Sequence, residues 1–305
     1  MMRAGHIAAR VGPTLADLPT PPEGCAGWPW TTADARVSDV MPGGAPWPAL
    51  TIVTPSLNQG AFLEQAIRSV LLQGYPLVDL RIVDGGSTDG SVGIIRKYGP
   101  WLAGWVSEPD RGQSHAINKG FTARQGSWCS WLNADDFLLP GALAEVARAA
   151  QSAPAGVAVV GGCQRVLSDG ALLNVIQPRG LTRHGLADWS GEGFFYQPSC
   201  FVATRAIDEA GPLDETLHYA FDLDWWLRLS ALGAFVATNQ VLAAATIHDR
   251  AKTQLRRLEM HAEILAVQVR HGFLDCAASK LDGLLRAARD QRASSRFWRM
   301  VRRQV

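Results

Sequence analysis

The chain has 305 residues, of which 47% are hydrophobic and 19% are charged. This balance is typical of a globular protein with one large domain or two small ones, and it excludes a disordered tail protein, a coiled coil and a small disulfide-rich scaffold. The 29 Lys and Arg residues nearly cancel the 28 Asp and Glu residues, which argues against a nucleic-acid binder.

Five cysteines are scattered through the chain without any CxxC spacing: Cys25, Cys129, Cys163, Cys200 and Cys276. This pattern indicates neither a zinc site nor a disulfide framework, and it suits a reducing cytoplasm. No segment resembles a signal peptide or approaches the ~18 apolar residues of a membrane span. We therefore expect a cytoplasmic protein, either in solution or at the inner face of the cell membrane.

Residues 1–48 contain eight of the 17 prolines and show little periodicity. They predict an extended, largely non-helical arm. Within the arm, the segment Gly27-Trp28-Pro29-Trp30 is too aromatic for a simple linker. We expect this segment to pack on the surface of the domain that follows.

Strands and helices alternate in the next hundred residues. Apolar runs predict strands at 50–54, 80–83, 105–107 and 128–132. Apolar residues at helical spacing predict helices at 61–72, before Tyr98, at 114–122 and at 138–150. This alternation predicts βαβ units and a mainly parallel sheet covered on both faces. Each polar cluster follows a strand, at the edge where open α/β sheets bind ligands.

After Ala155 the pattern changes. A hairpin is predicted from 157–166 and 171–176, with its turn at Asp169-Gly170. A further strand is predicted at 196–203, and helices are predicted at 221–232, 252–272 and 281–301.

The loop Asp84–Gly90 is rich in glycine and carries side-chain acceptors. Glycines let the backbone approach a ligand closely, and a carboxylate at a strand end can accept from a ribose hydroxyl or a base N–H. The same residues are also typical of an Asx-type turn that caps the next helix. Both interpretations stay open.

The segment Asn133-Ala134-Asp135-Asp136 follows directly after a buried strand. Two carboxylates in this place are costly to desolvate unless something positive lies beside them. A divalent cation with oxygen ligands, bridging to a diphosphate, would satisfy them. The alternative is that Asp135 or Asp136 caps the helix predicted at 138–150.

Two further carboxylates, Asp222 and Asp224, precede the pair Trp225-Trp226. A carboxylate beside apolar rings tends towards a raised pKa, which suits a general base. Alternatively, one of the two caps the helix and the other pairs with Arg228. His248 follows an apolar strand, and a lone histidine is more often structural than a ligand.

Taken together and in this order, these segments resemble a family 2 nucleotide-sugar glycosyltransferase with the GT-A fold, over roughly residues 48–255. The matching motifs are at 51–60, 83–90, 107–113, 116–120, 131–136, 197–199, 221–229 and 248–253. The Gly-Trp-Pro-Trp arm resembles a bacterial subgroup of that family. The implied fold is α/β, with a GT-A (Rossmann-like), mostly parallel central sheet flanked by helices.

The resemblance also implies the domain organisation. Residues 1–48 would be the arm, 49–255 the glycosyltransferase domain, and 256–305 the C-terminal helices. Within the domain, 49–150 would be the nucleotide-binding half and 151–255 the acceptor half.

Carried over residue by residue, the resemblance implies these roles. The nucleotide would be held by Thr54, Pro55, Ser56, Asn58, Asp84, Ser87, Asp110, Arg111, Asn133, Ala134 and Lys252. Asp135 would bind Mn²⁺ or Mg²⁺ on the diphosphate, and His248 would close over this metal. Asp222 would be the base that deprotonates the acceptor hydroxyl.

The sequence departs from the family pattern at two positions. Asn133 replaces the first aspartate of the DXD motif, and Phe221 replaces the glutamate before the base. An amide oxygen can face a cation but contributes no charge, and Asp136 could compensate for the missing carboxylate. These departures concern metal dependence more than the fold.

The resemblance implies an inverting hexosyl transfer from a nucleotide-sugar to a glycan or lipid-linked acceptor, in bacterial surface-polysaccharide synthesis. A UDP-sugar is the favoured donor, with GDP or dTDP as alternatives. A nucleotidyltransferase would need a basic residue in Pro55–Gly60, which has none. A non-catalytic nucleotide- or glycan-binding module is the other alternative, suggested by Asn133 and opposed by the retained Asp135, Asp222 and His248.

From Cys276 to Val305, eight basic residues accompany two acidic ones, so this tail carries +6 and the rest of the chain −5. Six arginines recur every three or four residues, along one face of a helix: Arg286, Arg289, Arg292, Arg296, Arg299 and Arg303. Such a helix can lie on an anionic bilayer, where each basic residue contributes about 1 kcal/mol. The alternative is a solvated basic face packed against the acidic body.

Overall fold

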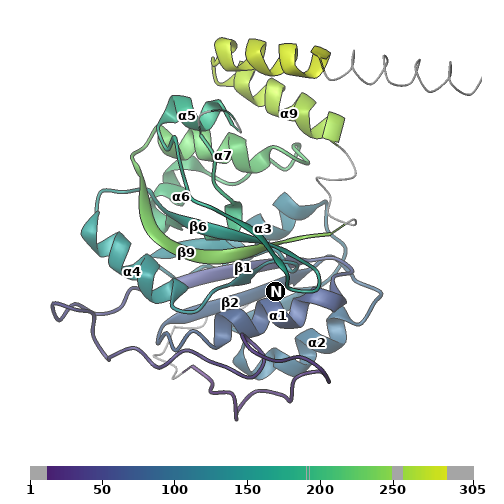
Figure 1. Ribbon diagram of the computed structural model, residues 1–305, viewed down its shortest axis with the longest axis vertical. Helices are drawn as coiled ribbons and strands as arrows, with labels where there is room; N and C mark the ends of the chain where they lie inside the picture. Colours follow the sequence, from purple (N-terminus) through teal and green to yellow (C-terminus); the bar gives the residue numbers. More distant parts are fainter. Residues whose placement is uncertain (1–11, 190, 192, 249–256, 287–305) are drawn as a thin grey trace, which may run out of the picture.

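The computed structural model describes residues 12–189, 191, 193–248 and 257–286 (Figure 1). These residues form a nine-stranded sheet with the spatial order β3-β2-β1-β4-β8-β6-β9-β5, and β7 pairs with β6. The strands are β1 (Leu50–Ser56), β2 (Val78–Asp84), β3 (Gly104–Ser107), β4 (Trp128–Trp131), β5 (Phe137–Leu138), β6 (Ala158–Leu167), β7 (Leu172–Ile176), β8 (Cys200–Ala203) and β9 (Phe235–Ile247).

The first four strands in this order are mutually parallel. Their register places Ser56 beside Asp84 and Asp84 beside Ser107, so the loops that follow β1, β2 and β3 leave the sheet at one edge. The other half is mixed, because β8 runs antiparallel to both β4 and β6 while β6 and β9 are parallel. The structure therefore confirms the predicted α/β class.

Helices cover this sheet and extend beyond β9, where α7 and α9 lie at the end of the molecule opposite α2 (Figure 1). Their bounds are α1 (Gly60–Leu71), α2 (Ser91–Tyr98), α3 (Gln113–Thr122), α4 (Ala142–Ser152), α5 (Arg183–Ala187), α6 (Thr204–Ala210), α7 (Phe221–Ser230) and α9 (Arg257–Arg270). Two short 3₁₀ helices are η1 (Gly99–Trp101) and η2 (Gln197–Ser199), and residues 274–286 are also helical.

Hydrophobic spacing explains how these helices pack. Leu63, Ile67 and Val70 of α1 recur at helical spacing and are fully buried. Helix α3 lies so close to β1 that a Cβ on Gly120 would meet the side chain of Val53. Close helix–sheet packing therefore fixes the loops between these elements, which carry the candidate site residues.

The predicted hairpin is confirmed, since β6 and β7 pair antiparallel, but two other predicted elements have wrong bounds. The helix predicted at 138–150 begins only at Ala142, because the chain first forms β5, in which Phe137 pairs with Ala244 of β9. The strand predicted at 196–203 is reduced to β8, because Pro198 lies in the short helix η2.

The C-terminal helices also differ from the prediction. The described part of α9 is Arg257–Arg270, and the next helical residues begin at 274 rather than at 281. The part of the predicted last helix from 287 onward lies outside the described residues, and so does 249–256.

The arm packs on the domain as predicted. Trp28 donates from Nε1 to the carbonyl of Leu138 at 2.7 Å. Arg68 of α1 is fully buried, and its guanidinium donates to the carbonyls of Pro29 and Trp30 at 3.0 and 2.9 Å. A buried guanidinium satisfied by arm carbonyls ties the arm to α1 through charge-assisted hydrogen bonds.

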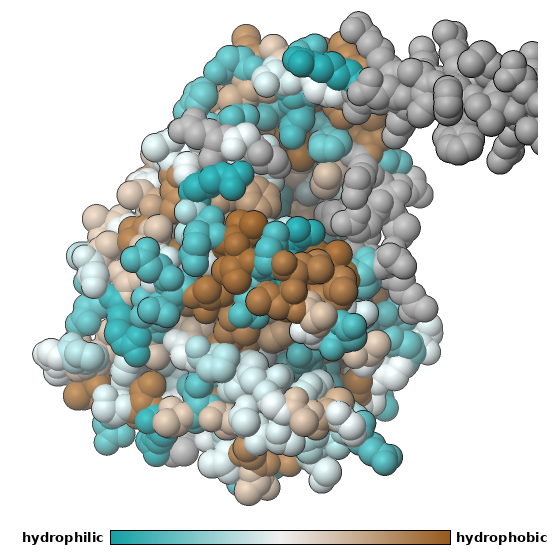
Figure 2. Space-filling model, viewed as in Figure 1, coloured by the Kyte–Doolittle hydropathy of each residue, from teal (hydrophilic) through white to brown (hydrophobic). Residues whose placement is uncertain are grey.

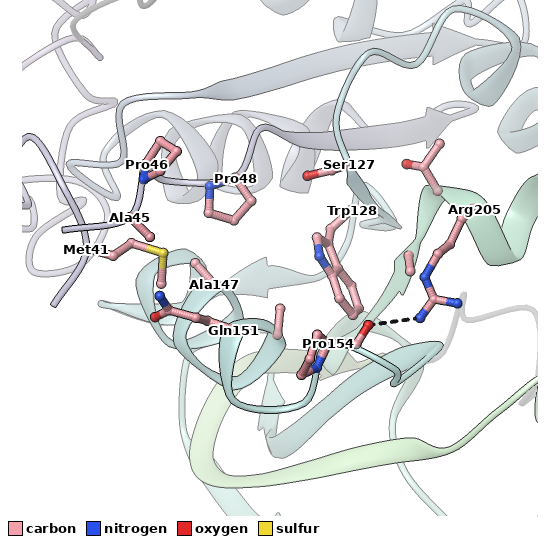
Figure 3. Close-up of a pocket in the computed structure, with 13 residues that line it drawn as sticks. Met41, Ala45, Pro46, Pro48, Ser127, Trp128, Ala147, Gln151, Pro154 and Arg205 are labelled. Carbon is pink, nitrogen blue, oxygen red and sulfur yellow. Dashed lines mark hydrogen bonds between the residues drawn. The ribbon is translucent and has the colours of Figure 1, made fainter. Parts of the chain in front are cut away.

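A cavity of about 410 Å³ lies where the arm meets α4 and the first residues of β4 (Figure 3). Met41 and Pro48 of the arm line it together with Trp128, and Arg205 donates to the carbonyl of Pro154 at its rim. The cavity is therefore at the amino ends of β1 and β4, at the edge opposite the polar loops. Among the described residues, none of those predicted for the active site lines it.

One face of the molecule carries an apolar patch over the β6–β7 hairpin (Figure 2). The exposed members of this patch are Leu167, Leu172, Leu173 and Val175.

All five cysteines are free thiols. Within the described ranges, every helix is too short or too polar to cross a bilayer.

Candidate active site

A cleft of about 850 Å³ opens at the edge of the sheet where β1 and β4 end. It brings together many of the residues predicted from sequence: Pro55, Ser56, Asp110, Asn133, Ala134, Asp135 and Asp222. The cleft is not lined by six other predicted residues: Thr54 of β1, Asp84 of β2, Asn58 and Ser87 of the loops that follow these strands, Arg111 and His248. Lys252 lies outside the described residues.

Asp135 lines the cleft and lies beside His248. The Oδ2 atom of Asp135 lies 3.0 Å from Nε2 of His248, and the His248 ring stacks on Phe62 with centroids 4.8 Å apart. The two side chains are 21% and 8% exposed, so Asp135 remains accessible from the cleft. The end of β9 thus places His248 beside the loop after β4, and its contact with a metal stays a prediction.

Asp136 is buried beside this pair. Its Oδ1 accepts from the backbone N–H of Thr246 at 3.2 Å, and its Oδ2 accepts from Nδ2 of Asn133 at 3.1 Å. Burial, together with the negative charge of Asp135, raises the pKa of Asp136 well above its usual value. The helix-capping alternative is wrong, because the N-cap of α4 is Gly141, without a side-chain hydrogen bond.

Asn133 is held between α3 and the acidic pair. Its Oδ1 accepts from Nε2 of Gln113 at 2.7 Å, so its Nδ2 is turned toward Asp136. In this arrangement the amide oxygen is already in use, and Asn133 supplies a donor to the carboxylate that follows. Gln113 also lines the cleft; it lay in a matched motif, but its type and position gave no signal of this contact.

The loop after β2 is closed by its own hydrogen bonds. Oδ2 of Asp84 accepts from the N–H groups of Gly86 and Ser87, at 3.1 and 2.9 Å, and from the hydroxyl of Ser107 at 2.6 Å. The Ser87 hydroxyl donates to Oδ1 of the same fully buried carboxylate. The predicted Asx-type turn is therefore confirmed, but it does not cap the next helix, because the N-cap of α2 is Gly90 and has no side-chain hydrogen bond.

Asp89 and Asn58 join this loop to the loop after β1. Asp89 accepts from the N–H groups of Ser91 and Gly60 at 2.9 and 2.8 Å, at the starts of α2 and α1. Asn58 has a positive φ of 54°, and its Oδ1 accepts from Thr88 N–H at 2.9 Å. These side chains brace the two loops against each other.

Asp110 and Arg111 diverge in the structure. Asp110 lines the cleft, and a Cβ on Gly85 would lie only 2.7 Å from its Oδ2, so the glycine lets Asp110 approach the loop after β2. The guanidinium of Arg111 instead pairs with Glu215 at 2.5 Å and is 70% exposed. It is not among the lining residues of the cleft.

Asp222 and Asp224 lie in the first turn of α7 but have different surroundings. Asp222 lines the cleft, and its Oδ1 accepts from Leu223 N–H at 2.7 Å. Asp224 is buried, with Nε of Arg228 at 3.0 Å and Nε2 of His271 at 2.9 Å. Burial alone would raise the pKa of Asp224, but the hydrogen bond from His271 and the charge of Arg228 outweigh it and lower this pKa.

The alternative proposed for this pair is confirmed in one half only. Asp224 does pair with Arg228. The N-cap of α7 is Ala220, however, which has no capping side chain, and Asp222 accepts from the N–H of the residue that follows it.

Part of the cleft wall is aromatic, which the sequence analysis missed. This aromatic wall consists of Trp189, Phe194, Tyr196 and Tyr219, and residues of α9 lie beside it in the lining. The α9 residues are Met260, His261 and Ile264. The aromatic content of 189–196 was a signal in the sequence, but the contribution of α9 had none, because the resemblance ends near 255.

Comparison with known proteins places this cleft in a family context. The family model described as "Glycosyl transferase family 2" matches residues 51–211. An uncharacterized glycosyltransferase of Rickettsia typhi is 24% identical over 219 residues, covering 70% of this chain and 69% of that protein. A PGL/p-HBAD biosynthesis glycosyltransferase of Mycobacterium bovis is 35% identical over 94 residues, which cover 30% of this chain and 37% of that protein.

Solved structures share the fold. The crystal structure of S. aureus TarS 1-349 in complex with UDP-GlcNAc has a TM-score of 0.59 and 15% identity, over 72% of this chain and 66% of that one. The mannosyltransferase PcManGT from Pyrobaculum calidifontis, in complex with GDP-Man and Mn²⁺, has a TM-score of 0.55 and 17% identity, over 79% of each chain. At these identities the likeness concerns the fold alone.

Proposed function

Because the chain belongs to glycosyltransferase family 2, we propose that it transfers a sugar from a nucleoside-diphosphate donor to a hydroxyl acceptor, with inversion at the anomeric carbon. One observation carries this proposal: a single cleft is lined by the acidic pair after β4 and by Asp222 of α7. The donors named in the TarS and PcManGT complexes, UDP-GlcNAc and GDP-Man, support this class of donor.

A divalent cation fits the residues around Asp135. Asp135 and Asp136 are adjacent carboxylates, and the raised pKa of Asp136 reflects burial and the unfavourable charge of its neighbour. A cation would remove that conflict, and carboxylate oxygens with an imidazole nitrogen are ligands that Mn²⁺ accepts. We propose Asp135 and His248 as the residues that hold Mn²⁺ or Mg²⁺, which would offset negative charge on the diphosphate leaving group.

The chain's own residues supply the other parts of the reaction. Asp222 would accept the proton of the acceptor hydroxyl as that oxygen attacks the anomeric carbon from the face opposite the diphosphate. The nucleoside would lie against Pro55, Ser56 and Asp110, which line the same cleft. A single displacement of this kind inverts the anomeric centre and needs no covalent enzyme intermediate.

The acceptor would bind against the aromatic wall of the cleft. The rings of Trp189, Phe194 and Tyr219 offer flat apolar faces, and Trp189 and Tyr219 add a polar N–H or O–H, which suits the stacking of sugar rings. We propose a glycan or lipid-linked acceptor, in the synthesis of a bacterial surface polysaccharide.

Peripheral contact with a membrane would suit a lipid-linked acceptor. Leu274, Leu281 and Leu285 recur at helical spacing in 274–286 and are 64%, 47% and 48% exposed, and the basic residues of the tail follow directly in the sequence. An exposed apolar face with flanking arginines is typical of an interfacial helix. Co-sedimentation with phosphatidylglycerol vesicles that is unchanged by deletion of 286–305 would contradict this contact.

The proposed function is tested by nucleotide release. Purified protein is incubated with Mn²⁺ and with UDP-, GDP- and dTDP-sugars in turn, and the free nucleoside diphosphate is measured with Asp222→Asn as the matched control. We expect one class of donor to be consumed by the wild type and spared by the variant. Folded protein could instead bind a nucleotide tightly but release no nucleoside diphosphate from any donor, even with acceptor glycans present. This result would favour the non-catalytic module. The hydrogen bond that already occupies the Asn133 amide oxygen also suggests that alternative.

A further inference from the structure

We propose that Glu263 of α9 is a positioning residue for this reaction, because its carboxylate holds the loop 218–220 from which α7 and Asp222 begin. The proposal rests on the proposed function, since it assigns Glu263 a role in setting the position of the base. Glu263 lies beyond the stretch that the family model matches and beyond the resemblance described from sequence.

Three successive backbone N–H groups converge on the Glu263 carboxylate. His218 N lies 3.0 Å from both Oε1 and Oε2. Tyr219 N and Ala220 N lie 2.6 and 3.0 Å from Oε2. Consecutive N–H groups that point into one concavity form an anion-binding nest, and here a side chain from another helix fills it.

This contact lies directly before the first turn of α7, at its N-cap residue and the two residues ahead of it. The first N–H groups of a helix have no partner inside it, and the positive end of its dipole favours a negative charge nearby. Ala220 is the N-cap residue and has no side-chain oxygen. Glu263 of α9 instead accepts from the N–H of Ala220, two residues before Asp222, and places its negative charge at this end of the helix.

The loop held by Glu263 is part of the cleft wall. His218, Tyr219 and Asp222 line the cleft on one side of the contact, and Met260 and Ile264 of α9 line it on the other. A shift of the loop would therefore move Asp222 together with His218 and Tyr219 in the cleft wall.

A second anchor between α9 and α7 provides a matched control. At the far end of α9, Arg270 pairs with Asp214 at 2.8 Å and lies 3.6 Å from Asp224. Arg270 is 49% exposed and does not line the cleft. Arg270→Ala thus weakens the attachment of α9 without touching the loop 218–220.

The test compares Glu263→Ala, Glu263→Gln and Arg270→Ala with the wild type, using the donor that the wild type consumes. We expect Glu263→Ala to lower kcat by about 10- to 100-fold, with KM for the donor and the affinity for its nucleotide changed less than about twofold. Glu263→Gln keeps an acceptor for the N–H groups and should restore most of kcat, and Arg270→Ala should keep it within about threefold. Equal losses of kcat in Glu263→Ala and Arg270→Ala, or an unchanged kcat in Glu263→Ala, would overturn the proposal.

Hydrogen exchange separates this proposal from the proposed function. Amide exchange measured on the whole protein should accelerate about tenfold or more at 218–220 in Glu263→Ala, and not in Arg270→Ala. Equal exchange in the two variants would overturn the positioning role, whatever the activity. A wild type that consumes no donor would contradict the proposed function instead.

Discussion

The loops after β2 and β4 both carry aspartates at one edge of the sheet, but they satisfy these carboxylates differently. Asp84 accepts four hydrogen bonds from Gly86, Ser87 and Ser107, all within the loop and the neighbouring strand. Among the described residues, Asp135 has one hydrogen-bond partner, His248, and it lines the cleft. A carboxylate whose oxygens already accept several hydrogen bonds from the fold stabilises a loop, whereas a carboxylate that faces a cleft is available for chemistry.

The same contrast recurs within one turn of α7. Asp224 is buried and paired with Arg228 and His271, while Asp222 lines the cleft. Four aspartates thus divide into two that hold the structure and two that we assign to the reaction. Each assignment predicts a different response to substitution.

The largest expected effect is on turnover in Asp222→Asn. Loss of the general base should lower kcat by about 10²- to 10⁴-fold, because an amide cannot take the acceptor proton. The free energy of unfolding should change by less than about 1 kcal/mol. Steady-state kinetics measures the loss of kcat, and thermal unfolding measures the change in stability. Normal turnover in the variant would show that Asp222 is not the base.

Asp84→Ala should have the largest effect on stability. It leaves two half-buried N–H groups and the hydroxyls of Ser87 and Ser107 without their acceptor, which should lower the free energy of unfolding by about 3 kcal/mol. Urea denaturation measures this change, with Ser107→Ala, which removes one donor, expected to cost about 1 kcal/mol. A stable Asp84→Ala variant would mean that Asp84 does not hold the loop.

Asp224→Asn should destabilise the protein by about 2 kcal/mol at pH 7. The folded pKa of Asp224 is lowered, so its ionised form adds stability above the unfolded value of about 4, and this stability is lost as the pH falls through the folded pKa. The difference between wild type and variant should therefore shrink below about pH 4. Urea denaturation at pH 7 and pH 3 tests this, and a pH-independent difference would refute the charge argument.

The smallest effect on stability is expected for Asp135→Asn. In metal-free buffer the free energy of unfolding should change by less than about 1 kcal/mol, since the pair with His248 is a single partly exposed contact. The gain in melting temperature that Mn²⁺ gives to the wild type should disappear in the variant. Thermal unfolding with and without Mn²⁺ measures both, and an undiminished gain would place the metal elsewhere.

Local patterns in the sequence predicted the fold and the position of the site. Apolar runs that end in polar loops predicted the parallel strands, and parallel pairing brings the ends of β1 and β2 to one edge, with Ser56 beside Asp84. The loop after β4 and Asp222 were singled out from residue types that are costly to bury without a partner. Local sequence holds this information because each strand and the loop after it are adjacent in the chain.

Contacts between distant segments were beyond sequence reasoning. The orientation of Asn133 depends on Gln113 in another helix, and the late start of α4 depends on the pairing of Phe137 with Ala244, more than a hundred residues later in the chain. Glu263 reaches His218 across 45 residues. No residue type or spacing signals such contacts, because they are set by how the elements pack.

The most direct test of the central claim is calorimetric titration of the wild type and Asp135→Asn with UDP, GDP and dTDP, each with and without Mn²⁺. The account predicts that one nucleotide binds the wild type and that removal of Mn²⁺ weakens it at least about tenfold, which is about 1.4 kcal/mol. It also predicts that Asp135→Asn binds equally weakly with and without the metal. Binding of the same strength with and without Mn²⁺ in the wild type, or no binding of any nucleotide by folded protein, would contradict the assignment of the loop after β4.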